Sequence, residues 1–312
     1  MKTLDLVGLG ECMVEFYAEE PLAQVRTFTR SVGGDVLNAL VAAARLGSRT
    51  GFITRVGDDP FGPGLLKVWQ DEGIDTRCAP LVQGENGVYF ISLKENGERD
   101  FTYRRANSAA SKLAPEDLDP QYLASTRMVL LSGITQAISP SAEAATLRAA
   151  QLAHSSASLV AYDPNYRPAL WNGRGGLKAA QRAFEQLRPY VDVLLPSYPA
   201  DMALLGLEPP DPATALQALG KYCPRTGLKV GDQGAWLGWE GKILHVPAAA
   251  PTQIRDTTGA GDAWNGAFLH GLLQGWEPFE AAIFANRLAA AKLAHRGAIA
   301  PKPWPMDAQV VI

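Results

Sequence analysis

The segment DTTGAGDAWNGAF, residues 256–268, places two threonines, two glycines and an aspartate directly before a run with helical spacing of apolar residues. Glycines at 259 and 261 allow a sharp turn and a close approach of the backbone to a ligand. A glycine-rich loop that enters a helix directs free N–H groups and the positive end of the helix dipole at one point, which favours an anion. Asp262 stands at that point, and its carboxylate, with an ordinary pKa of about 3.9, can accept a proton from a hydroxyl.

A second interpretation gives Asp262 only a structural role, as the N-cap of the helix, which is the commoner role of an aspartate there. The cap does not account for the glycine pair or for the residues at 256–258. A base beside an anion site is the arrangement expected for phosphoryl transfer to a hydroxyl, where positioning and charge stabilisation dominate. We therefore take phosphoryl transfer as the hypothesis to test against the rest of the chain.

Apolar runs of strand length alternate with helical patterns over most of the sequence. The predicted strands are residues 4–8, 51–56, 127–132, 159–163 and 191–195, and the predicted helices are residues 36–46, 64–72, 141–154 and 176–187. Such alternation predicts an α/β fold with a mostly parallel sheet and helices on both faces. In this architecture ligands bind beyond the carboxyl ends of the strands.

One region, VYFISLKENGERDFTYRR at residues 88–105, has two alternating segments about an Asn96-Gly97 turn, which is typical of a hairpin. If residues 95–97 form a three-residue loop, Tyr89 pairs with Tyr103 and shares a face with Tyr103 and Arg105. A two-residue loop moves Tyr89 to the opposite face. We expect the hairpin to project from the α/β body as a small β flap.

The composition is that of an ordinary globular protein, with 312 residues, 47% hydrophobic and 20% charged. A net charge of −3 argues against binding to nucleic acid or to an anionic membrane surface. The N-terminus does not resemble a signal peptide, and no apolar stretch approaches the roughly 20 residues that span a bilayer. Three widely spaced cysteines and four histidines form no metal motif, which favours a reducing, cytoplasmic setting.

Two other nucleotide motifs are absent. Gly8-x-Gly10 follows the first strand, but Met13 stands where a dinucleotide motif needs its third glycine. The sequence GDDPFGPG at residues 57–64 lacks the lysine of a P-loop.

The pattern DTTGAGD, residues 256–262, resembles the C-terminal signature of the ribokinase-like (PfkB) sugar kinases. SVGGDVLNALVAAARLG at residues 31–47 is similar to their N-terminal glycine motif, TRVGDDPFG at 54–62 to the loop that follows, and KVGDQGAW at 229–236 to their nucleotide-contacting turn. The resemblance covers nearly the whole chain. It implies one ribokinase-like domain over residues 1–312, with a small β-sheet lid formed by insertions around 11–32 and 86–110 that would exclude water from the sugar.

The resemblance also implies a role for individual residues. Asp262 would be the catalytic base, with Gly259, Ala260 and Gly261 as the anion hole. The implied sugar-binding residues are Gly34, Asp35, Asn38, Tyr89, Tyr103, Arg105 and Arg167. The implied nucleotide-side residues are Asn165, Arg167, Ser197, Lys229, Gly231, Gln233, Gly234 and Asn286.

The implied phosphoryl donor is ATP, with Mg²⁺ carried on its phosphates rather than held in a protein cage. The family's N-x-x-E motif is replaced by Ser197-Tyr198-Pro199-Ala200, with Asp201 one place late. Family members often pair through their lids, which predicts a homo-oligomer. The need for a monovalent cation stays open at this stage.

Two arginines indicate which sugar is bound. Arg167 lies between Pro164 and Pro168 in a stiffened loop, and Arg105 lies on the predicted lid. A sugar carboxylate gains from bidentate arginine pairing, whereas a neutral sugar does not need it. This arrangement resembles the 2-keto-3-deoxygluconate kinases, which implies phosphorylation of that sugar acid on its terminal hydroxyl to the 6-phosphate.

Several alternatives remain. Ala298 stands where those kinases often place an acidic sugar contact. The sequence is also compatible with a kinase of 5-dehydro-2-deoxygluconate, fructose or ribose. A further alternative is a sugar-binding sensor without catalytic activity.

Overall fold

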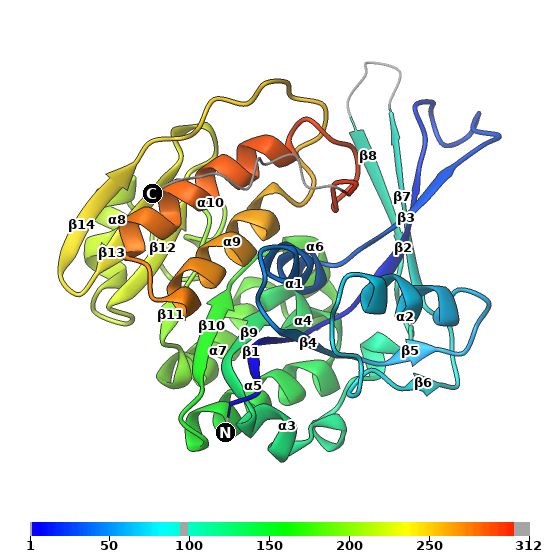
Figure 1. The fold of residues 1–312 in the computed structure, drawn as a ribbon, viewed down its shortest axis with the longest axis horizontal. Helices are drawn as coiled ribbons and strands as arrows, with labels where there is room; N and C mark the ends of the chain where they lie inside the picture. The colour runs from blue at the N-terminus through cyan, green and yellow to red at the C-terminus, as the bar shows by residue number, and fades with distance from the viewer. Residues whose placement is uncertain (1, 94–98, 303–312) are drawn as a thin grey trace.

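The computed structural model describes residues 2–93 and 99–302. Its larger sheet has the strand order β14-β13-β12-β11-β10-β9-β1-β4 (Figure 1). The neighbours from β4 to β12 pair in parallel, and β13 and β14 are added antiparallel. The strands are β1 (Leu4–Leu9), β4 (Thr50–Ile53), β9 (Thr126–Ser132), β10 (Leu159–Asp163), β11 (Val193–Leu194), β12 (Arg225–Lys229), β13 (Ala235–Trp239) and β14 (Lys242–Val246). The predicted α/β class with a mostly parallel sheet is confirmed.

Helices cover both faces of this sheet, because successive strand residues point to opposite sides. Met128 and Leu130 pack into one core with α1 (Asp35–Arg45), α2 (Gly62–Asp71), α9 (Ala260–Gln274) and α10 (Pro278–Lys292). Val129 and Leu131 pack into the other with α3 (Pro120–Ala124), α5 (Pro140–Ser155), α7 (Gly176–Leu187) and α8 (Pro212–Leu219). The short helices α4 (Gly133–Ile138) and α6 (Pro168–Trp171) follow β9 and β10.

Three helices of the second face begin in the same way. A proline stands at the first helical position, and the residue before it, Asp119, Ser139 or Asp211, accepts a hydrogen bond from an amide of the first turn. Proline lacks the N–H that has no partner there, and the side-chain oxygen satisfies another of the free amides. These helix starts are therefore encoded locally.

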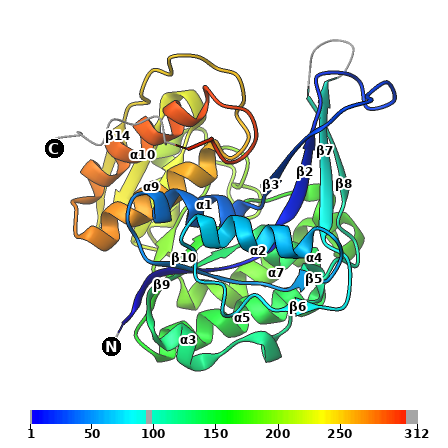
Figure 2. The ribbon, with the colours of Figure 1, turned by 45° about the vertical axis from the view of Figure 1, so that its right-hand side comes forward.

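A separate four-stranded sheet, called here the small sheet, projects from the body in the order β3-β2-β7-β8 (Figure 2). Its strands are β2 (Met13–Tyr17), β3 (Thr29–Gly33), β7 (Gly87–Leu93) and β8 (Arg99–Arg104). Tyr89 pairs with Tyr103, which is the register of the three-residue loop, although the turn itself lies outside the described residues. The two rings stack with centroids 5.7 Å apart, and the Arg105 guanidinium lies 5.4 Å from the Tyr103 ring centre.

The predicted strand at 51–56 is wrong in one respect. The chain leaves the larger sheet after Ile53 and continues as β5 (Val56–Gly57), which pairs with β6 (Leu81–Val82). The amides of Thr54 and Val56 donate to the carbonyls of Cys78 and Pro80. Since apolar residues occupy both pieces, periodicity alone did not mark the break.

Cys12, Cys78 and Cys223 are free thiols. Within residues 2–93 and 99–302, no helix combines the length and the apolar character needed to cross a lipid bilayer.

Candidate active site

A cavity of about 720 Å³ opens at the carboxyl ends of the parallel strands, and side chains of the small sheet, among them Tyr89 and Tyr103, also line it. Asp163 is the last residue of β10 and Lys229 the last residue of β12, and both line this cavity. Glu11 follows β1, and Ser197 follows β11. This is the edge at which α/β sheets bind ligands, because the loops that follow parallel strands converge there. We call it the first cavity.

The start of α9 forms one wall of the first cavity. Its two glycines, Gly259 and Gly261, differ in whether the fold could accept a side chain at their position. Gly259 has φ +74°, and a Cβ there would lie 2.5 Å from the carbonyl oxygen of Ala298, so the fold itself requires glycine. At Gly261 the nearest atom to an added Cβ would be Cδ of Lys229, at an ordinary 3.9 Å. Packing within the protein therefore does not require glycine at 261, and the space beside it belongs to the cavity.

The first turn of α9 offers free hydrogen-bond donors. Among the described residues, the amides of Gly261 and Asp262 donate to no protein acceptor. The amide of Ala260, which was predicted as part of the anion hole, instead donates to the carbonyl of Thr257 at 3.2 Å. Two unpaired amides at the positive end of a 15-residue helix are suited to hold an anion.

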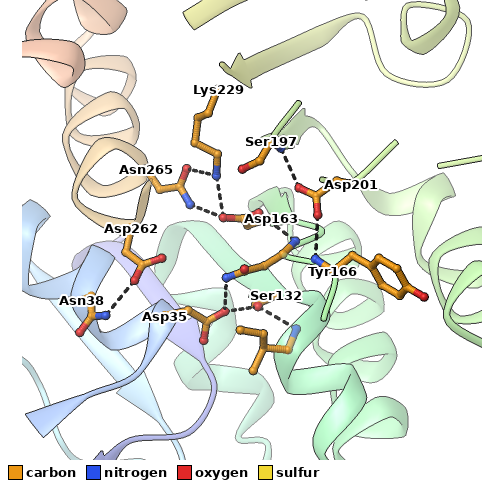
Figure 3. Close-up of polar contacts among 12 residues, drawn as sticks. Asp35, Asn38, Ser132, Asp163, Tyr166, Ser197, Asp201, Lys229, Asp262 and Asn265 are labelled. Atoms are coloured by element: carbon orange, nitrogen blue, oxygen red, sulfur yellow. Dashed lines mark hydrogen bonds and ion pairs between the residues drawn. The ribbon is translucent and has the colours of Figure 1, made fainter. Parts of the chain in front are cut away.

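Asp262 is the third residue of α9, and its carboxylate turns away from its own helix. Oδ2 accepts a hydrogen bond from Nδ2 of Asn38 in α1, at 2.8 Å (Figure 3). The N-cap is Gly259, and no side chain caps this helix. The interpretation of Asp262 as an N-cap is therefore wrong.

The environment of Asp262 prepares it to take up a proton. Burial, with a further contribution from the carboxylates of Asp35 and Asp163, raises its pKa to about 7, against the opposing effects of Asn38 and Lys229. A carboxylate with a pKa near neutrality is a stronger base than an ordinary aspartate, and it is half ionised near pH 7 and largely ionised above it. The position and the pKa both suit a general base.

All seven residues predicted to hold the sugar line the first cavity: Gly34, Asp35, Asn38, Tyr89, Tyr103, Arg105 and Arg167. Asp35 accepts hydrogen bonds through Oδ2 from the Ser132 hydroxyl and from Nδ2 of Asn165, the latter at 3.1 Å. Its Oδ1 is buried without a partner among the described residues. A buried acceptor without a partner is costly, so a ligand hydroxyl would be a favourable partner.

Arg105 is already paired within the protein. Its guanidinium contacts the carboxylate of Glu11, which is 2% exposed and lines the same cavity. Burial, and to a lesser extent the nearby Arg167 guanidinium, lowers the pKa of Arg105 to about 10. Arg105 and Arg167 line the same cavity, and among the described residues Arg167 forms no ion pair. These two guanidiniums can therefore pair with a carboxylate supplied by a ligand.

A second cavity of about 500 Å³ adjoins the first at the start of α9, and the two share Lys229, Thr257 and Gly261. Its walls are mostly apolar and include Ala249, Ile254 and Leu293. Of the residues predicted on the nucleotide side, Lys229, Gly231, Gly234 and Asn286 line this second cavity, as does Ala260 of the predicted anion hole.

The other nucleotide-side predictions lie elsewhere. Asn165 and Ser197 line the first cavity and not the second. Gln233 is exposed and lines neither cavity, although its backbone carbonyl bonds to Nε2 of His245 at 2.9 Å. Asn286 uses its side chain within the protein, accepting from Trp264 and donating to the carbonyls of Val246 and Pro247. It therefore shapes the wall of the second cavity.

A buried hydrogen-bond network beside the first cavity includes two residues that the sequence analysis did not identify, Asp163 and Asn265 (Figure 3). Nζ of Lys229 donates to Oδ2 of Asp163 at 2.8 Å and to Oδ1 of Asn265 at 3.0 Å. Asn265 also donates to Asp163 at 2.6 Å. Asp163 ends a predicted strand directly before Pro164, and its place at the carboxyl end of that strand was the signal that could have identified it.

Asp201 stands one position after the place of the glutamate in the family's N-x-x-E motif. Its carboxylate bonds to backbone amides within the protein. Its two oxygens accept from the amides of Ser197 and Tyr166, each at 2.7 Å, and it is 1% exposed. Asp201 thus joins the loop after β11 to the loop after β10. Burial and the nearby Asp163 raise its pKa to about 6.

Sequence reasoning also missed Arg99, on β8 of the small sheet. Its guanidinium contacts the carboxylate of Asp256 and donates to Oγ1 of Thr258 at 3.2 Å. Arg99, Phe101 and Tyr103 alternate along β8, Arg105 follows directly after its end, and all four line the first cavity, so the period-two pattern held the signal. Through Arg99 the small sheet contacts the loop that begins α9.

Within the part of the chain that the structure describes, no group of three or more His, Cys, Asp or Glu side chains has the arrangement of a metal site.

The sequence matches the family model described as pfkB family carbohydrate kinase over residues 3–305. The chain belongs to this family. This pfkB kinase is 33% identical to a 2-dehydro-3-deoxygluconokinase of Thermoproteus tenax, over 99% of its own chain and 94% of the relative. It is 28% identical to a 5-dehydro-2-deoxygluconokinase of Clostridium perfringens, over 93% and 87% of the two chains.

Among solved structures, this pfkB kinase resembles an uncharacterized sugar kinase from Pyrococcus horikoshii in complex with ATP. The TM-score is 0.80 at 26% identity, with 94% of this chain and 93% of that chain covered. The predicted family and the predicted ribokinase-like fold are both confirmed.

Proposed function

We propose that this pfkB kinase transfers the γ-phosphoryl group of ATP to the terminal hydroxyl of a sugar acid, 2-keto-3-deoxygluconate, and forms its 6-phosphate. The observation that carries the proposal is the placement of Arg105 and Arg167 in the same cavity as the free amides of α9 and Asp262. Guanidiniums at one part of the cavity would hold the sugar carboxylate, and the far hydroxyl would face the base.

In the reaction, Asp262 accepts the proton of the terminal hydroxyl while the hydroxyl oxygen forms a bond to the γ-phosphorus. The bond from that phosphorus to the oxygen of ADP breaks, and ADP keeps the electron pair. The amides of Gly261 and Asp262 donate to the phosphoryl oxygens, whose charge is greatest in the transition state. The apolar second cavity would receive the adenine ring, with Lys229 at the junction of the two cavities.

The floor of the first cavity fits a cation that arrives on the phosphates of ATP. Asp35 and Asp163 both raise the pKa of Asp262, which is the effect of an excess of negative charge at this point. Mg²⁺ carried by ATP would neutralise phosphate charge, and Asp163 and Asp262, which both line the first cavity, would contact it through its waters.

The names of relatives add support for the substrate, since one relative is a kinase of 2-dehydro-3-deoxygluconate, the same sugar acid. A second candidate substrate is 5-dehydro-2-deoxygluconate, for which another relative is named and which also carries a carboxylate. Initial rates on these two acids, fructose and ribose would separate the possibilities. We expect the highest kcat/KM with 2-keto-3-deoxygluconate, and robust turnover of neutral sugars alone would contradict the proposal.

Arg105→Ala is expected to raise the Kd for the sugar acid by about 10- to 100-fold and to leave the Kd for ATP nearly unchanged, since one charge-assisted contact is lost. The truncation also leaves Glu11 unpaired in the cavity, where its charge would repel the ligand carboxylate. The double variant Glu11→Gln/Arg105→Ala should therefore bind the sugar acid better than Arg105→Ala alone. Calorimetry of all three proteins tests this, and equal losses for both ligands would refute a carboxylate contact.

The pH dependence of the reaction should report the pKa of Asp262. Because the base acts in its ionised form and its pKa is raised to about 7, kcat/KM for the sugar acid should fall tenfold per pH unit below that value and level off above it. The measurement is kcat/KM between about pH 5 and pH 9 at constant ionic strength. A profile that stays flat down to pH 5 would exclude a base with this pKa.

A further inference from the structure

Lys292, the last residue of α10, is fully buried, with 0% of its surface exposed. Its Nζ donates to the backbone carbonyl of Asp256 at 3.0 Å and to that of His295 at 3.3 Å. Among the described residues no carboxylate forms an ion pair with it. A buried ammonium is costly unless its hydrogens find acceptors, and here backbone carbonyls supply them.

These two carbonyls belong to two segments that lie side by side. The amides of Arg255 and Asp256 donate to the carbonyl of Leu293, at 2.7 and 3.1 Å. The amide of Gly297 donates to Oδ2 of Asp256 at 2.8 Å. The ammonium of Lys292 therefore joins residues 255–259, which lead into α9, to residues 293–298, which follow α10 and lie between the helices and the small sheet (Figures 1 and 2).

The second segment in turn fixes the first turn of α9. Gly259, the N-cap, packs directly against the backbone of Ala298, with no room for a side chain between them. Ala298 and Gly259 both line the first cavity. A shift of residues 293–298 would therefore move the amides that follow Gly259.

We propose that Lys292 is a positioning residue whose ammonium acts as an internal cation, holding the two segments together so that the α9 amides face the transferred phosphoryl group. This inference rests on the proposed phosphoryl transfer. Backbone carbonyls are also the ligands that hold K⁺ in proteins, and an ammonium is a cation of similar size and the same charge. Because Lys292 supplies that charge from within the chain, the kinase needs no monovalent cation at this point.

The wild-type protein gives the first test. Its kcat should change by less than about twofold when K⁺, NH₄⁺ or Na⁺ is replaced by tetramethylammonium at the same ionic strength, with Mg²⁺ held constant. Strict dependence of the wild-type enzyme on K⁺ or NH₄⁺ would overturn the proposal. The test uses the sugar that the enzyme turns over fastest. If the proposed substrate is wrong, the same comparison between cations is made with another sugar, so the two proposals can fail independently.

The second test is Lys292→Met, whose unbranched side chain ends one atom short of Nζ, so that the charge is removed and the place of the ammonium between the two carbonyls is vacated. We expect kcat to fall by about 10- to 100-fold, as for a small misplacement of a catalytic group, with the KM of the sugar changed by less than about threefold. Addition of about 0.1 M NH₄⁺ or K⁺ should restore part of kcat, whereas tetramethylammonium should not. Such rescue is not expected of a residue that only contributes to stability.

Hydrogen exchange gives a readout besides activity. Amides in residues 256–262 should exchange faster in Lys292→Met than in the wild type, and NH₄⁺ should slow them again. If the variant does not fold, the wild-type cation series still decides the proposal. A folded variant with wild-type kcat, or with a loss that neither NH₄⁺ nor K⁺ reverses, would overturn it.

Discussion

Asp262→Asn is expected to slow turnover by about 10²- to 10⁴-fold while sugar and ATP still bind with nearly wild-type Kd values, because the amide cannot accept the hydroxyl proton. The substitution keeps the size of the side chain and an oxygen that can accept from Nδ2 of Asn38, so the contact between α9 and α1 is retained. Steady-state kinetics and calorimetry on the same preparation measure the two effects separately. The acid limb near pH 7 should disappear in this variant.

A matched control is Asp71→Asn, which makes the same chemical change on the exposed face of α2, where Asp71 pairs with Lys67. This variant should keep wild-type kcat and KM, since an exposed ion pair contributes little. Retention of most of the wild-type kcat by Asp262→Asn would remove Asp262 from the role of base.

Gly261→Ala is expected to lower kcat by about 10²-fold, because the added methyl group displaces the phosphoryl group from the free amides by about 1 Å. No steric conflict within the protein accompanies the change, since the nearest atom to the new Cβ is 3.9 Å away. Alanine also favours the helical conformation over glycine, so the Tm should stay equal or rise. Loss of activity with retained stability is the expected combination.

Gly64→Ala is the control for this substitution. Gly64 lies in the first turn of α2, and an added Cβ would have Nη1 of Arg30 as its nearest neighbour, at 3.8 Å. Both variants should gain or keep stability, and only Gly261→Ala should lose turnover. Equal kcat for the two would show that the space beside Gly261 is not used by a ligand.

Much of the fold could be predicted from local patterns. Residues 176–187 were predicted as a helix and 159–163 as a strand, and the structure has α7 and β10 at those residues. At these residues the spacing of the apolar side chains was enough to predict the element, because a helix that buries one face and a strand that buries both faces each leave a regular pattern in the sequence. At residues 51–56 it was insufficient, since the chain changes partner from β1 to β6 while both environments remain apolar.

The same division applies to the candidate site. The glycine pair and Asp262 were recognisable because a loop that feeds a helix has a local sequence pattern. Asn265 gave no such signal, since an asparagine inside a helix acquires its role only when Lys229 and Asp163 arrive from two different strands. Gln233 was predicted on the nucleotide side, but the turn from Gly231 to Gln233 leaves its side chain exposed.

By itself the sequence determined the α/β class, the family and the chemical elements of the site, because each depends on short-range periodicity or on one contiguous motif. Tertiary structure alone decided the pairing of Arg105 with Glu11, the contact of Arg99 with Asp256 and the burial of Lys292 between two carbonyls. These contacts join residues 94, 157 and 36 positions apart. Their partners are selected by the packing of whole elements, which no local pattern of residues encodes.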